Sequence, residues 1–259
     1  MNTVFAYTGG AAAAPRAPAT VFVHGAGMDH TVWRHLARYL AHHQHRVLAI
    51  DLPGHGGSSG PVPTSVEEAS DWLAAYTEAA GAQRFSLVGH SLGGLVALQL
   101  ASAHADRVDR LVLIATGVTM PVHPQLLESA IAGEARAVEL IVSWSFGPRG
   151  RRGGRSDPGT SAAMAVRRIL QRGLASSLGP DLAASDRYRV GASAASLISV
   201  PTLVVVGSED RMVPVTAAAQ LAEAIAGAKL AVIEGTGHMM TIEHPEAVQE
   251  VVVGFLEGR

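Results

Sequence analysis

Residues 87–98 read LVGHSLGGLVAL: an apolar run leads into Gly-His-Ser-Leu-Gly-Gly, and apolar residues then resume at helical spacing. A turn between a strand and a helix does not by itself require small residues on both sides of a serine. Ser91 could cap the N-terminus of the following helix, but a cap needs neither Gly89 nor Gly93. The pattern therefore predicts that Ser91 is a nucleophile placed at the end of a buried strand.

Short apolar runs rich in β-branched residues recur on both sides of this stretch, separated by helical patterns. The expected strands are 3–7, 20–23, 46–50, 85–88, 110–114, 202–206 and 230–233, and the expected helices are 32–41, 65–80, 92–103, 215–226 and 245–256. Because the runs are continuous, they are typical of strands buried on both faces of a parallel sheet. The alternation predicts an α/β fold with a doubly wound, mostly parallel sheet.

One long segment interrupts the alternation of strands and helices. Helical patterns occur at 125–144 and 162–175, with the polar, glycine-rich stretch 147–161 between them. We therefore expect a core formed by residues 1–117 and 199–259, and a helical cap inserted at 118–198. Within the cap, Gly147–Gly154 is the part expected to move most.

Chemically active side chains follow several of the expected strands. Since the carboxyl ends of parallel strands meet at one edge of a sheet, Ser91, Asp210 and His238 should come together there. A histidine can deprotonate a serine hydroxyl, and a carboxylate on its far side fixes the tautomer of the imidazole. Asp210 is favoured as that acid over its neighbour Glu209 and over Asp51.

The segment Gly89-His90-Ser91-Leu92-Gly93 resembles the nucleophile elbow of the α/β-hydrolase fold, whose catalytic residues occur in the same order of serine, acid and histidine. The segments HGAG (24–27) and DLPGHGGSS (51–59) are similar to the oxyanion loop and a following turn of that family. The resemblance covers nearly the whole chain. It implies a carboxylesterase- or lipase-like serine hydrolase with a helical cap, in which Ser91 attacks, His238 is the base and the N–H groups of Ala26 and Leu92 form the oxyanion hole.

The cap composition favours a small to medium hydrophobic ester, cleaved through an acyl-enzyme intermediate. The candidate pocket residues are Gly25, His90, Met120, Trp144, Phe146 and Met239. A carbon–carbon bond hydrolase, a lactonase or a thioesterase could use the same three side chains. A ligand-binding receptor that kept the fold is the alternative from another functional class.

The charge balance argues against several other classes of function. The 259-residue chain has a net charge of −2 with histidine neutral, which provides no strong field for nucleic acid or an anionic membrane. The histidines at 42–45 and the arginines at 149–155 are best explained as a solvated helix end and a solvated loop. We therefore expect no metal, no organic cofactor and no nucleic-acid or membrane partner, with a small ester-like molecule as substrate.

Cysteine usage and the N-terminal segment bear on the compartment. The chain has no cysteine, which excludes disulfides and thiolate chemistry and is compatible with a reducing compartment. No basic segment followed by an apolar one resembles a secretion signal, and no apolar run is long enough to span a bilayer. These features predict a cytoplasmic protein, while a monomer and a homodimer both remain open.

Overall fold

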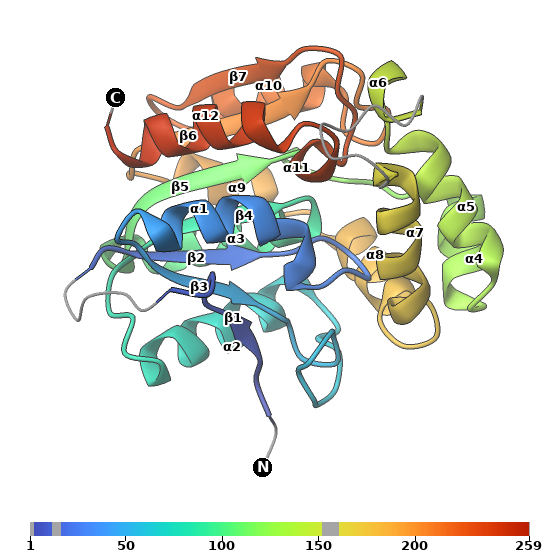
Figure 1. Ribbon diagram of the computed structural model, residues 1–259, viewed down its shortest axis with the longest axis horizontal. Coiled ribbons are helices and arrows are strands. Elements are labelled where there is room, and N and C mark those ends of the chain that lie inside the picture. Colours follow the sequence, from blue (N-terminus) through green and yellow to red (C-terminus); the bar gives the residue numbers. More distant parts are fainter. Residues whose placement is uncertain (1–2, 12–16, 152–160, 259) are drawn as a thin grey trace.

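The computed structural model describes residues 3–11, 17–151 and 161–258 (Figure 1). Its centre is a seven-stranded sheet with the strand order β1-β3-β2-β4-β5-β6-β7. The strands are β1 (Ala6–Tyr7), β2 (Ala19–Val23), β3 (Arg46–Ile50), β4 (Phe85–His90), β5 (Val108–Ile114), β6 (Thr202–Gly207) and β7 (Lys229–Ile233). Only β1 runs antiparallel, against β3, and all other described neighbours are parallel. The predicted α/β fold with a mostly parallel sheet is therefore confirmed.

The two edges of the sheet differ from expectation. β7 was predicted to be buried on both faces, but Leu230 and Val232 are each 39% exposed. The prediction was wrong there because β7 pairs only with β6 and lies at the edge of the sheet. At the other edge, β1 begins at Ala6 rather than Thr3, because the N–H groups of Thr3 and Phe5 donate to the side chains of Ser59 and Ser58, in the loop that follows β3, instead of to a strand.

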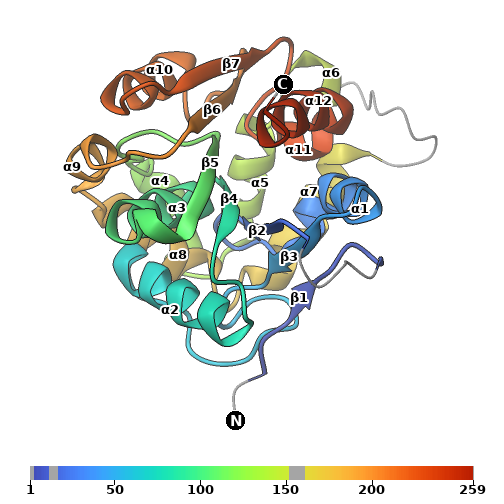
Figure 2. The same cartoon turned by 90° about the vertical axis from the view of Figure 1, so that its left-hand side faces the viewer.

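Helices cover both faces of the sheet (Figure 2). One face carries α2 (Val66–Ala79), α3 (Leu92–Ala103), α9 (Gly191–Ser196) and α10 (Val215–Ala224), and the other carries α1 (Arg34–His42) and α12 (Pro245–Leu256). Short helical turns are η1 (His30–Trp33), η2 (Ala105–Arg107) and α11 (Met240–Glu243). The five helices predicted for the core are all present, with ends that shift by at most two residues, because their apolar faces pack on the buried strands.

The segment between β5 and β6, which includes the predicted cap at 118–198, is mainly helical in its described part. It contains α4 (Pro124–Ile131), α5 (Ala135–Trp144), α6 (Pro148–Arg151), α7 (Ala162–Gly173), α8 (Leu178–Arg187) and then α9. The helical pattern at 125–144 forms two helices, because Gly133 adopts a φ of +67° and ends the first. In Figure 1, α4 to α8 lie beyond the carboxyl ends of the strands, whereas α9 packs against α3 and α10. The limits of the cap stay a prediction.

The arginine-rich stretch and the possibility of a membrane-spanning helix were also considered in the sequence. Of the stretch predicted to be mobile and rich in arginine, residues 152–160 lie outside the described ranges. None of the helices within the described ranges is both long and apolar enough to cross a bilayer.

Candidate active site

The serine of the 87–98 stretch sits between β4 and α3 in a constrained turn. Ser91 has φ 55° and ψ −120°, a backbone conformation that residues with a side chain rarely adopt, and its N–H donates to the carbonyl of Ile114 at 2.9 Å. A Cβ on Gly89 would lie 2.2 Å from the carbonyl oxygen of Gly93, and one on Gly93 would lie 2.2 Å from that of Val23. The side chain of Ser91 makes no capping bond to the described helix α3. The glycines are therefore required by close backbone packing, and the hydroxyl is left for another partner.

That partner is His238, which joins the three predicted side chains in one hydrogen-bonded chain. Nε2 of His238 lies 3.0 Å from Oγ of Ser91, and Nδ1 lies 2.9 Å from Oδ2 of Asp210. Because a carboxylate can only accept, Nδ1 carries the proton and Nε2 can take one from the serine. The other carboxylate oxygen of Asp210 accepts the N–H groups of Met212 and Val213 at 2.8 and 2.9 Å, which fixes its orientation. All three side chains are buried.

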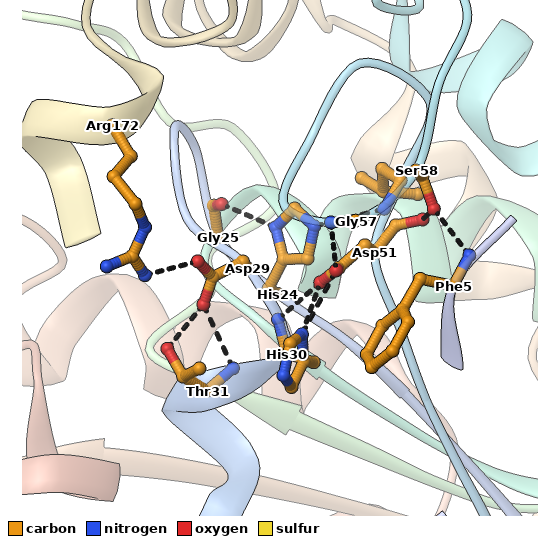
Figure 3. Close-up of polar contacts among 11 residues, drawn as sticks. Phe5, His24, Gly25, Asp29, His30, Thr31, Asp51, Gly57, Ser58 and Arg172 are labelled. Carbon is orange, nitrogen blue, oxygen red and sulfur yellow. Dashed lines mark hydrogen bonds and ion pairs between the residues drawn. The ribbon is translucent and has the colours of Figure 1, made fainter. Parts of the chain in front are cut away.

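The competing acids lie elsewhere. The Asp51 carboxylate accepts the N–H and the ring nitrogen of His30 and the N–H of Gly57 (Figure 3). Glu209 is exposed at the surface. Neither carboxylate is a partner of His238 in the described structure.

The N–H groups of Ala26 and Leu92 belong to residues that line the same cavity as Ser91 and His238. Leu92 is the first residue of α3, so its N–H has no acceptor within the helix. In the loop after β2, the Gly25 carbonyl accepts the N–H of Met28 at 3.2 Å and Nδ1–H of His24 at 2.9 Å. The Gly25 carbonyl and the Ala26 N–H are opposite ends of one trans peptide, so these bonds direct the Ala26 N–H the other way.

His24 can orient this peptide because its protonation state is fixed. Its Nε2 accepts the N–H of Leu52 at 3.1 Å, which leaves Nδ1 as the donor to the Gly25 carbonyl (Figure 3). Burial, followed by the charge of His55, lowers the pKa of His24 to about 4. His24 is therefore a neutral donor throughout the physiological pH range.

His90 was predicted to line the pocket, but its side chain is fully buried and faces the backbone instead. Its Nε2 donates to the carbonyl of His238 at 3.0 Å. Burial, and then the neighbouring His238, lowers the pKa of His90 to about 3. His90 is thus a neutral residue beneath His238, outside the cavity.

A cavity of about 360 Å³ opens in front of Ser91, between the sheet edge and the helices that follow β5. Of the six predicted pocket residues, Met120 and Trp144 line it. Phe146 and Met239 do not, because both side chains are packed into the core, and Gly25 lies against His90 and Ser91. The cavity lining also includes Pro121, Val122, His123, Leu126, Leu182, Ser185, Arg211, Met212 and Val213.

Most of these additional lining residues were missed. They come from the loop after β5, from α8 and from the turn after Asp210. The three-dimensional placement of the segment between β5 and β6 brings the first two groups to Ser91, and the third follows Asp210 directly in the chain. The walls are mainly aliphatic and aromatic, with His123 and Trp144 in ring contact at 5.6 Å. Among the described residues that line the cavity, Arg211 alone carries a permanent charge.

The possible metal ligands of the described ranges include the histidine run at 42–45. The described ranges contain no group of three or more His, Cys, Asp or Glu side chains arranged to hold a metal ion. The histidines at 42–45 lie at the end of α1, where Nδ1 of His43 donates to the Tyr39 carbonyl.

Comparison with known proteins extends the resemblance found in the sequence. Residues 20–251 match the model of the alpha/beta hydrolase family. A pimeloyl-[acyl-carrier protein] methyl ester esterase of Aeromonas hydrophila is 30% identical, over 92% of this chain and 95% of its own length. The polyketide synthase ThaQ of Burkholderia thailandensis is 32% identical over 93% of this chain, which spans only 12% of that much longer protein.

Solved structures of other proteins are also similar to this chain. A thermophilic esterase is 27% identical with a TM-score of 0.80, over 100% of this chain and 98% of the other. The enol-lactonase of Burkholderia xenovorans has a TM-score of 0.82 at 24% identity, over 99% of this chain and 96% of the other, which shows a shared fold.

Proposed function

This chain belongs to the alpha/beta hydrolase family, and we propose that it is a serine hydrolase that cleaves small to medium hydrophobic carboxylic esters through an acyl-enzyme intermediate. The observation that carries the proposal is the hydrogen-bonded chain Ser91–His238–Asp210, which meets a mainly apolar cavity at the serine hydroxyl. Esterases among the similar proteins support the choice of ester hydrolysis.

In the proposed acylation step, Oγ of Ser91 attacks the ester carbonyl carbon while Nε2 of His238 takes the hydroxyl proton. The Ala26 and Leu92 N–H groups stabilise the oxyanion of the tetrahedral intermediate. Collapse of that intermediate expels the alcohol, which receives its proton from His238. Asp210 stabilises the imidazolium and keeps the ring oriented.

Deacylation repeats these steps with water. His238 removes a proton from the water, the resulting hydroxide attacks the acyl carbon, and Ser91 leaves with the proton returned by His238. This sequence needs no metal or organic cofactor. Lactones and thioesters react at the same acyl carbon, and carbon–carbon bond cleavage would use the same nucleophile and base, so a substrate panel separates these alternatives.

The proposal is tested by labelling with a fluorophosphonate probe and by turnover of p-nitrophenyl esters. We expect the wild-type protein to be labelled and to hydrolyse these esters, and the Ser91→Ala variant to lose both activities. Ser102→Ala, which removes a serine on the same helix that bonds to the Gln99 carbonyl, is the matched control and should behave as wild type. A wild-type protein that is not labelled, or full ester turnover by Ser91→Ala, would refute the proposal.

A further inference from the structure

A buried carboxylate on α8 contacts the loop that carries the Ala26 N–H. Oδ2 of Asp181 accepts the N–H of Gly27 at 2.7 Å and Nε2–H of His55 at 2.8 Å. Asp181 and His55 are each 3% exposed, and 126 residues separate them in the chain. A side chain of the segment between β5 and β6 is thus fixed to two loops at the carboxyl edge of the sheet.

The surroundings of His55 define its protonation state. Its Nδ1 lies 2.9 Å from the carbonyl oxygen of Pro53, while its Nε2 faces the carboxylate of Asp181. Both partners can only accept a hydrogen bond, so both ring nitrogens must donate. This arrangement is satisfied by the imidazolium form alone, which makes the contact a buried ion pair.

Other charged and titratable groups around His55 support this assignment. Burial alone would lower the pKa of His55, but the hydrogen bond and charge of Asp181, with smaller effects from Pro53 and Asp51, raise it above its ordinary value. The neutral His24 ring lies 4.9 Å away. Across the adjoining cavity stand Asp29, His30 and Arg172, of which Arg172 of α7 binds Asp29 (Figure 3).

Gly27 connects the ion pair to the candidate oxyanion hole. It follows Ala26 in the tight turn closed by the Met28 N–H, and its φ of +63° turns its own N–H toward α8. A Cβ at this position would lie 2.8 Å from the side chain of Leu178, so α8 packs closely on the turn. Leu182 and Ser185, on the same helix as Asp181, line the substrate cavity.

We propose that Asp181 and His55 act as a positioning pair that couples the substrate-lining helix α8 to the oxyanion loop, so that the pair, through Gly27, adds to the bonds on the Gly25 carbonyl that hold the Ala26 N–H in place. This inference rests on the proposed ester hydrolase function. The pair touches no reacting atom, and its effect on catalysis passes through Gly27. The coupling predicts a loss in kcat rather than in KM, because the oxyanion forms only after the substrate has bound.

The pair also gives the reaction a second dependence on pH. Deprotonation of His55 leaves one ring nitrogen facing an oxygen that cannot donate, so the contact with Asp181 or with Pro53 is lost. Because the folded-state pKa is raised, the contribution of the pair is complete below the ordinary histidine value and is lost as the pH rises through the folded value. The wild-type kcat should therefore fall on the alkaline side.

The kinetic test compares Asp181→Asn and His55→Gln with wild type, using p-nitrophenyl acetate across a range of pH. Asp181→Asn should lower kcat by about ten- to a hundredfold, which is less than the roughly 10²–10³-fold loss on removal of an oxyanion donor, with KM changed by less than about threefold. His55→Gln keeps a donor toward Asp181 without a titrating proton, so it should retain most of kcat and lose the alkaline decline. Glu139→Gln, which removes the charge from an exposed ion pair between α5 and α7, is the control in the same region.

A second measurement does not depend on turnover. Nitrogen NMR of wild-type protein at neutral pH should show an imidazolium signal that is absent from the spectrum of His55→Gln. A neutral His55, or an Asp181→Asn kcat equal to wild type at every pH, would overturn the positioning pair. If wild type hydrolyses no ester at all, the proposed function fails, and the NMR signal still decides whether the buried ion pair exists.

Discussion

Nε2 of His90 donates a hydrogen bond to the backbone carbonyl of His238 across 3.0 Å, although 148 residues separate them in the chain. The two rings lie 5.0 Å apart, and both side chains are buried. His90 therefore supports the backbone of the residue that contacts Ser91, while taking no place in the cavity itself.

This contact predicts a role for His90 in placing the base. His90→Leu removes the donor and should lower kcat by about tenfold or more with little change in KM, because a small displacement of Nε2 weakens proton transfer. His90→Gln places an amide N–H near the same position and should recover most of the lost kcat. Steady-state kinetics on one ester checks both variants, and a His90→Leu enzyme with wild-type kcat would rule out this role.

The lowered pKa of His90 leads to a prediction of how the stability of the protein depends on pH. Burial holds the pKa of His90 at about 3, so the unfolded chain takes up a proton below about pH 6.5 that the folded chain refuses. Wild-type stability should therefore fall as the pH drops from 6.5 toward 4. In His90→Gln that slope should be shallower by about 1.4 kcal/mol per pH unit, measured from urea unfolding at several pH values. An identical slope in both proteins would contradict the assignment.

Much of the core fold could be predicted because hydrophobic pattern and buried packing agree there. The predicted strands β2 to β6 and the helix α3 follow directly from long apolar runs. The same signal fails at β7, since Leu230 and Val232 form an apolar run whether the strand is central or at an edge. It also fails at α8, where Gly179 and Pro180 lie inside a helix with a weak apolar pattern.

Some residues of the candidate site could be predicted from the sequence, and others could not. Ser91, Asp210 and His238 each follow a predicted strand, so the sheet edge alone brings them together. Asp181 and His55 meet only through the placement of α8 over the sheet edge, and no local pattern marks either residue as a partner. His90 stood next to the nucleophile in the sequence and was expected in the pocket, but β4 directs its ring toward the His238 backbone instead.

The buried carboxylate of Glu243 should stabilise the folded chain close to His238. The carboxylate accepts the N–H of Gly150 at 2.7 Å, of Gly237 at 2.8 Å and of Gly147 at 3.2 Å. Glu243→Gln replaces one acceptor oxygen by a donor and should lower the free energy of unfolding by about 1–3 kcal/mol. Glu243→Ala leaves all three N–H groups without the carboxylate and should cost more.

Urea unfolding measures both effects, with a shift in midpoint at constant slope. Glu223→Gln is the control, since Glu223 is exposed on α10, and its midpoint should match wild type. Glu243 binds the N–H of Gly237, which directly precedes His238. The Glu243 variants should therefore lose kcat as well as stability. Glu243→Ala with wild-type stability would show that the three bonds contribute nothing.

Trp144 predicts the size of the acyl group that the cavity accepts. Its ring forms one wall of the cavity of about 360 Å³ and contacts His123, so Trp144→Ala should lengthen the space available beyond Ser91. The preferred p-nitrophenyl ester should then shift from short or medium acyl chains toward longer ones. Each further methylene that the variant buries contributes about 0.8 kcal/mol, which raises kcat/KM about fourfold. The measurement is kcat/KM for acetate, butyrate, hexanoate, octanoate and laurate esters. Trp72→Ala, which removes a ring stacked on Tyr76 of α2, should keep the wild-type order of preference, and the same order in Trp144→Ala would mean that the acyl chain lies elsewhere.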